Sequence, residues 1–203
     1  ISVVQTAEGA LNEVHSMLQR MNELATQAAN DTNTTQDRNQ IKLEINQLSS
    51  EIDRVASTTQ FNTMNLLDGK FTGKNLQVGA LSGQAIGIDI SSMKASALGV
   101  KGSTLFVSTF AKAGSVMKKV QSAIDMVSTQ RAKLGAIQNR LEHTIANLDT
   151  TSENTSAAES RIRDTDMAKE MVNYSKNNIL AQAGQSMLAQ ANQSTQGVLS
   201  LLQ

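Results

Sequence analysis

Apolar residues recur at helical spacing through the last third of the chain, from about Gly114 to Gln203. Between residues 116 and 148 their spacing alternates between four and three, which is typical of a coiled-coil seam. The seam positions are Val116, Val120, Ala123, Val127, Gln130, Leu134, Ile137, Leu141, Thr144 and Leu148. Two of these positions are polar, and the pattern as a whole predicts a long helix from Gly114 to about Leu148.

Two further helices are predicted at the start of the chain, from about Thr6 to Asn30 and from about Gln36 to Thr58. Their seams are Leu11, Val14, Leu18, Met21, Ala25 and Ala28 in the first, and Ile41, Ile45, Leu48, Ile52 and Val55 in the second. The short polar break between them favours an antiparallel hairpin. Three narrow seams together predict a rod-like bundle.

The region between the second and third helices has a different pattern. Residues 61–69 end in Asp-Gly, a turn signal, and short alternating apolar runs follow at 76–78 and 86–90. This predicts one or two β-hairpins within about residues 61–90. Residues 91–113 fit either a strand or a connection. The polar residues 147–156 either interrupt the last helix or form a solvated part of it.

A second C-terminal helical run is predicted from about Thr165 to Leu202. The chain then ends in the apolar sequence VLSLLQ, although chain ends are usually polar and frayed. We therefore expect another molecule to cover this run. The predicted fold is mainly α: a rod-like antiparallel three-helix bundle with a small β-hairpin region, plus a separate C-terminal helix.

Composition narrows the classes of partner. The 18 basic residues balance the 18 acidic ones, which argues against a nucleic-acid or anionic-membrane surface. Aromatic residues make up 2% of the chain and tryptophan is absent, which suits narrow helix seams better than a broad core. Cysteine is absent, so disulfides and thiolate chemistry are excluded. The chain begins at Ile1 within an apolar pattern, so we expect a fragment or a processed chain.

Candidate catalytic and metal-ligating residues form no recognisable site. His15 and His143 fall on different helices, away from the seams, without a partner motif for zinc. Asp164, Asp166 and Glu170 lack the glycine and further oxygens of a calcium loop, so we interpret them as acids at a helix start. No nucleophile–base pair is evident. We therefore expect neither enzymatic activity nor a cofactor.

Several long strings together resemble bacterial flagellin. They occur in the family's order and cover nearly the whole chain, apart from about Lys94 to Lys112. The strings are ISVVQTAEGALNEV and LQRMNELATQAAN on the first helix, EIDRVASTTQFNTMNLLDG at the end of the second, RAKLGAIQNRLEHTIANL on the long helix, and AAESRIRDTDMAKEM, ILAQAGQSMLAQAN and VLSLLQ at the end.

The resemblance implies a domain organisation. Residues 1–155 are similar to the family's rod-shaped inner-tube domain, with the hairpin region at about 61–90. Residues 156–203 are similar to the C-terminal part of the innermost coiled-coil domain. The resemblance also implies that the family's N-terminal segment and large hypervariable outer domain are absent from this chain. Without the N-terminal segment the C-terminal helix lacks its coiled-coil partner, so polymerisation is expected to fail.

The resemblance implies a structural function: self-assembly into the bacterial flagellar filament, outside the cell, after export through the flagellar type III apparatus. Implied partners are further copies of the chain, a flagellar export chaperone and the hook–filament junction proteins. The residues expected to contact the chaperone and other copies are Ile179, Leu180, Met187, Leu188, Val198, Leu199, Leu201 and Leu202. The alternatives are a fragment that acts as a chaperone client or receptor ligand without polymerising, and a helical adaptor unrelated to motility.

The resemblance further implies recognition by vertebrate Toll-like receptor 5. The family's receptor patch carries over to Leu18, Gln19, Arg20, Glu23 and Leu24 on the first helix, and to Glu44 on the second. The match departs at residues 21–22, where many members have an aliphatic residue followed by arginine and this chain has Met-Asn. We expect that departure to lower receptor affinity without abolishing it, and Arg20 to be the main anchor, because arginine is common at interface hot spots.

Overall fold

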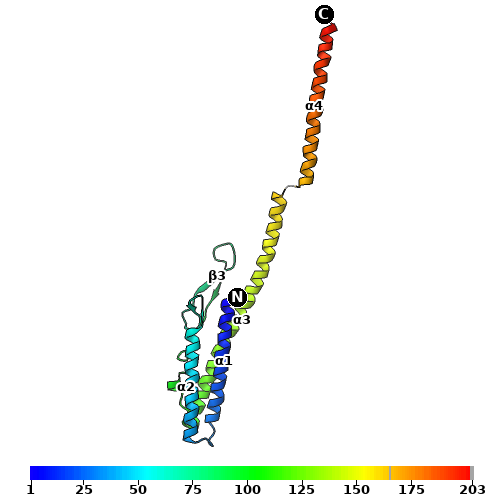
Figure 1. Ribbon diagram of the computed structural model, residues 1–203. Helices are drawn as coiled ribbons and strands as arrows, with labels where there is room; N and C mark the ends of the chain where they lie inside the picture. The colour runs from blue at the N-terminus through cyan, green and yellow to red at the C-terminus, as the bar shows by residue number, and fades with distance from the viewer. Residues whose placement is uncertain (165, 202–203) are drawn as a thin grey trace. The chain divides into compact units, whose positions relative to one another are not determined.

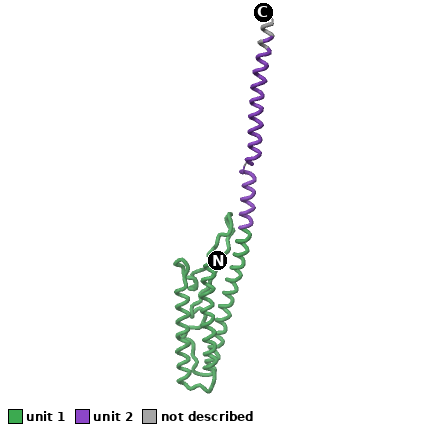
Figure 2. Tube along the Cα trace, turned by 45° about the vertical axis from the view of Figure 1, so that its right-hand side comes forward, with its two compact units in different colours: residues 1–148 green, residues 149–203 purple. Residues whose placement is uncertain are grey.

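The structure is a computed structural model that describes residues 1–164 and 166–201. Four helices, two small hairpins and one short 3₁₀ helix follow one another in the described residues. The chain divides into two compact units, Ile1–Leu148 and Asp149–Gln203 (Figure 2). The prediction of a mainly α fold with a three-helix bundle, a hairpin region and a separate C-terminal helix is confirmed.

Helices α1 (Ser2–Ala28) and α2 (Thr35–Thr58) form the antiparallel hairpin that their seams predict. They lie side by side in the first unit (Figure 1). A capping box fixes the start of α2, because the Thr34 and Asp37 side chains each bind the other's backbone N–H. Hydrogen bonds from Thr34 also lower the pKa of the Asp37 carboxyl below its ordinary value. The bond from the Thr34 side chain has the largest effect.

Helix α1 begins four residues earlier than the sequence pattern suggests. Val4 and Ala7 are buried, so they continue the same apolar stripe toward the N-terminus. The predicted start at Thr6 was therefore too late. Val4 and Ala7 are small, so they add only a weak apolar signal at the start of the helix.

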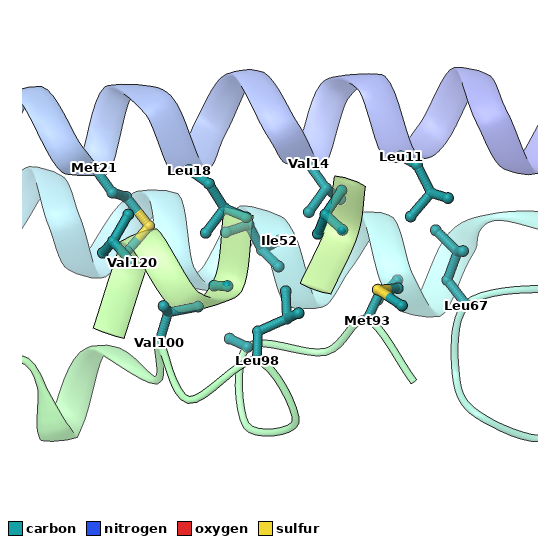
Figure 3. Close-up of a cluster of buried hydrophobic side chains, with 14 of the residues drawn as sticks. Leu11, Val14, Leu18, Met21, Ile52, Leu67, Met93, Leu98, Val100 and Val120 are labelled. Atoms are coloured by element: carbon teal, nitrogen blue, oxygen red, sulfur yellow. The ribbon is translucent and has the colours of Figure 1, made fainter. Parts of the chain in front are cut away.

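Helix α3 (Phe110–Arg163) is continuous, so the polar residues 147–156 form a solvated part of the helix and do not interrupt it. Hydroxyl groups in this part bond to carbonyls one turn back, as Thr155 Oγ1 does to Thr151 O at 2.8 Å. Its first part runs antiparallel to α1, because Arg131 Nε donates to Glu8 Oε1 at 2.8 Å while Val120 packs near Met21 (Figure 3).

The predicted seams meet in one core in the first unit (Figure 3). All six seam residues of α1 are buried. The α3 seam is buried as far as Leu141 except for Ile137, which is partly buried, whereas Leu148 is exposed. The polar interruption at Gln130 has a partner, because its Nε2 donates to the Asp89 backbone carbonyl at 3.0 Å. This bond ties the bundle to the hairpin region.

Two small antiparallel hairpins occupy the predicted region. Strands β1 (Gln60–Phe61) and β2 (Met64–Asn65) are joined by a tight turn, and β3 (Lys74–Gln77) pairs with β4 (Ala85–Ile88). Strand β4 faces the core with every second residue, because Ile86 and Ile88 are buried. The alternating runs therefore correspond to strands, as the sequence predicted.

Residues 90–108, which we name the strap, return from the hairpins to the start of α3. The strap runs antiparallel to α2: Ala95 N donates to Asp53 Oδ1 at 2.8 Å, Gly102 N to Ser49 Oγ at 2.9 Å, and Arg38 Nη1 to Ser108 O at 3.1 Å. It contains the 3₁₀ helix η1 (Gly102–Thr104) and no described strand. Of residues 91–113, which the sequence left open, the part up to residue 109 is thus a connection, and residues 110–113 belong to α3.

The strap is nevertheless part of the core. Its buried side chains are Ile90, Met93, Ala95, Leu98, Val100, Leu105 and Val107. Gly102 lies close to α2, since a Cβ added there would come 3.2 Å from Asn46 Cα. A side chain here would press on α2, so glycine favours the close approach of the strap to the helix.

Candidate functional site

Helix α4 (Met167–Leu201) places large apolar side chains in solvent. Ile179, Leu180, Met187 and Leu188 are 65%, 59%, 70% and 64% exposed. Soluble proteins seldom expose a continuous apolar surface unless it binds something. The other predicted contact residues are Val198, Leu199, Leu201 and Leu202. Their side chains lie outside the part of the chain that the structure describes.

The apolar residues of α4 are spread around the helix: two stripes lie on opposite sides, and Val172, Ile179 and Leu188 lie between them. Met167, Met171 and Tyr174 follow one stripe at its start, and all three are exposed. Leu180 and Met187, one heptad apart, follow another stripe further along. Nine residues separate Met171 from Leu180, which is two and a half helical turns, so the stripes point to opposite sides. One straight partner helix cannot cover both.

The start of α4 carries Asp166 and Glu170, two of the three acidic residues that the sequence assigned to a helix start. The assignment of Asp164 is corrected, because it follows the end of α3 and its side chain accepts a hydrogen bond from Ser160 Oγ. Asp166 Oδ1 accepts hydrogen bonds from Ala168 N at 3.0 Å and Lys169 N at 3.2 Å. Asp166 thus caps the helix, and its charge lies at the positive end of the helix dipole. Among the described residues there is no group of three or more His, Cys, Asp or Glu side chains able to hold a metal ion.

Arg20 forms the centre of a second surface, on α1 and α2. Its Nε donates to Glu44 Oε1 at 2.9 Å and its Nη1 to Glu23 Oε2 at 3.1 Å. These bonds, the one to Glu44 most, raise the pKa of the Arg20 guanidinium above its ordinary value. Arg20 is half exposed, so two carboxylates hold the guanidinium in place while one side stays open to solvent.

The structure separates the six predicted receptor residues into two groups. Gln19, Arg20, Glu23 and Glu44 are exposed. Leu18 and Leu24 are 0% and 2% exposed, and Leu18 points into the core (Figure 3). The assignment of Leu18 and Leu24 to a contact surface is therefore corrected: both side chains pack inside the bundle, and neither can touch a partner while it is folded.

A lysine-rich surface was not singled out by the sequence analysis. Lys42 Nζ lies 4.6 Å and Lys112 Nζ 5.9 Å from the centre of the Phe106 ring. Lys101 and Lys119 line an adjacent groove between the strap and α3. The signal for this surface was present in the sequence, because residues 90–124 contain five lysines and no acidic residue.

Comparison with known proteins identifies the family. Residues 1–72 match the family model of the bacterial flagellin N-terminal helical region, and residues 117–202 match that of the C-terminal helical region. A flagellin of Halalkalibacterium halodurans is 52% identical over 202 residues, which cover 100% of this chain and 74% of that protein. The chain belongs to the flagellin family.

Other flagellins agree in sequence and in fold. The flagellin of Bacillus subtilis is 49% identical over 236 residues, covering 100% of this chain and 77% of that protein. The crystal structure of Bacillus cereus flagellin superposes with a TM-score of 0.63 at 31% identity, and it covers 77% of this chain and 90% of that one.

Family membership gives the broad function. The chain is a structural subunit of the bacterial flagellar filament, a component that lies outside the cell, and its family is one of structural proteins and not of enzymes. A helical adaptor unrelated to motility is thereby set aside. Within the described ranges, no helix has both the length and the apolar character that crossing a membrane requires.

Proposed function

We propose that the exposed apolar sides of α4 are the contact surface of this flagellin, first for an export chaperone and then for other copies in the filament. The carrying observation is the exposure of Ile179, Leu180, Met187 and Leu188. Burial of apolar surface contributes about 25 cal/mol per Å², so covering these side chains gives a strong driving force for association. The sequence extends the same surface to Val198, Leu199, Leu201 and Leu202.

The spread of apolar side chains around α4 supports partners on more than one side of the helix. A chaperone that wraps the helix, or two neighbouring subunits, would bury both stripes at once. The proposal assigns residues 1–155 to the inner tube and residues 156–203 to the innermost domain, where such packing takes place. It also includes export through the flagellar type III apparatus and contact of the first assembled copies with the hook–filament junction proteins.

Amide hydrogen exchange with mass spectrometry tests the chaperone step. We expect fast exchange over residues 167–194 in the chain alone, since an isolated helix is marginal in water. Adding the cognate flagellar export chaperone is expected to slow exchange there at least about tenfold and to leave the α1–α2 hairpin unchanged. Strong protection of α4 in the monomer alone, or chaperone protection confined to the first unit, would contradict the proposal.

Recognition by Toll-like receptor 5 is the second function proposed. The observation that favours it is Arg20, which two carboxylates from α1 and α2 hold on a rigid surface. A preorganised arginine loses little conformational entropy on binding. The proposed receptor surface is Gln19, Arg20, Glu23 and Glu44. This surface is also compatible with a fragment that binds the receptor without polymerising.

Replacing Arg20 by alanine is expected to weaken receptor activation by about thirtyfold or more, the effect of losing a hot-spot residue. Thermal stability is expected to change little, because exposed ion pairs contribute little to folding. The measurement is a dose–response curve in receptor-expressing reporter cells, alongside circular-dichroism melting. Arg54→Ala is the control, since Arg54 is also exposed and paired with Glu51 three residues earlier. Equal potency of the two variants would rule out the Arg20 assignment.

A further inference from the structure

The lysine-rich surface, defined by Lys42, Lys101, Lys112 and Lys119, is continuous. Lys42 and Lys112 both lie over the Phe106 ring. One groove of about 120 Å³ is lined by Lys112, Lys119 and Thr104, and a second of about 460 Å³ by Lys101, Lys119 and Thr104. The grooves share Lys119 and Thr104, so they form one open track between the strap and α3.

The positive charge of this surface is not neutralised within the described part of the chain. Every ion pair recorded there uses an arginine, and none uses a lysine. Residues 90–124 contain no acidic residue, and Glu44, two positions from Lys42 on α2, is already paired with Arg20. A cluster of one sign of charge on a protein of zero net charge creates a local positive potential.

The groove lining distinguishes between polyanions. Hydroxyl groups of Ser96, Thr104, Ser115 and Ser122 lie along the track. Those of Thr104 and Ser115 donate to backbone carbonyls one turn back and can still accept hydrogen bonds from sugar hydroxyls. Phe106 is the one aromatic residue that lines either groove. Proteins that hold single-stranded nucleic acid rely on several aromatic platforms for base stacking, so nucleic acid fits poorly.

We infer that this surface binds a linear anionic polysaccharide outside the cell. The lysine ammonium groups pair with carboxylate or sulfate groups along the polymer, and the hydroxyl groups bond to the sugar rings between them. The inference rests on the position of the filament outside the cell and not on chaperone or receptor binding. It assigns a role to the strap and the start of α3.

Binding to a heparin oligosaccharide, a sulfated linear probe, tests the inference by titration calorimetry at two salt concentrations. The triple variant Lys101→Gln, Lys112→Gln and Lys119→Gln is expected to bind at least about tenfold more weakly and with a flatter salt dependence, because fewer counterions are released. These side chains are exposed, so the melting temperature is expected to stay unchanged. Lys42 is left intact because its stem packs on Phe106.

The matched control is Lys70→Gln, Lys74→Gln and Lys133→Gln, which removes the same charge from exposed positions outside the track. The control is expected to bind like the unsubstituted chain. Equal weakening in both triple variants would overturn the inference, since general charge would then explain binding, as would absence of binding at physiological salt. An oligothymidylate or phosphatidylserine vesicles that bind more tightly than heparin through the same lysines would overturn the polysaccharide assignment.

Discussion

Filaments are expected to be lost when Leu180 and Met187 are both replaced by aspartate. The two side chains share one stripe of α4 and are exposed in the chain alone. In a filament contact each buried side chain contributes about 1.5–3 kcal/mol. An unpaired carboxylate in its place adds a desolvation cost of several kcal/mol. Every subunit of a filament repeats the same contact, so the cost recurs along the whole filament. We therefore expect assembly to be lost and not only to become slower.

The variant is introduced into a flagellin gene whose product carries this chain together with the N-terminal segment, since the chain without that segment is not expected to polymerise. Filaments are counted by electron microscopy, and secreted monomer is measured in the medium. Ser152→Asp with Asn154→Asp is the control, because it adds the same charge at exposed positions in the solvated part of α3, outside α4. The first unit is expected to melt at the same temperature in both variants. Filaments of normal number and length in the Leu180/Met187 variant would show that this stripe is not an assembly contact.

Replacing Leu18 by alanine is expected to lower the free energy of unfolding by about 2–5 kcal/mol. Leu18 is fully buried near Ile52 of α2 and Leu98 of the strap (Figure 3). Truncation removes the apolar contacts and leaves a cavity that the surrounding helices only partly fill. For a domain of this size the melting temperature is expected to fall by roughly 4–20 °C.

Leu43→Ala is the matched control, because Leu43 is 64% exposed on α2 and the same atoms are removed. Urea unfolding followed by circular dichroism gives the free energies of both variants. A loss of receptor activation in the Leu18 variant is then expected only where the bundle itself has unfolded. A Leu18 variant as stable as the Leu43 variant would refute the core assignment and restore Leu18 as a contact candidate.

The helices were predictable because their evidence is local. Each seam repeats the same spacing over several turns, and Leu11, Val14 and Leu18 become buried as the repeat requires. The same repeat identifies the error in the receptor patch. Leu18 was counted both as a seam position and as a contact residue, and a side chain on a seam is covered by the neighbouring helices. The periodicity was the stronger signal.

The strap was not predictable because its evidence is non-local. Its apolar residues follow no helical or strand period, and its backbone bonds to side chains such as Asp53 and Ser49, about fifty residues earlier in the chain. The path of the strap depends on the surface of α2, to which its backbone bonds. The lysine run of residues 90–124 was visible in the sequence, but its approach to Lys42 was not, since Lys42 and Lys112 come near the same Phe106 ring only in the folded chain.

Tyr174 has a practical consequence for following α4. It is the single tyrosine of the chain, tryptophan is absent, and its ring is exposed near the start of the helix. The first unit carries only phenylalanine among the fluorophores, so emission excited at tyrosine wavelengths comes from α4 alone. In a sample of this chain alone, intrinsic fluorescence thus reports when another copy covers this helix, without any added label.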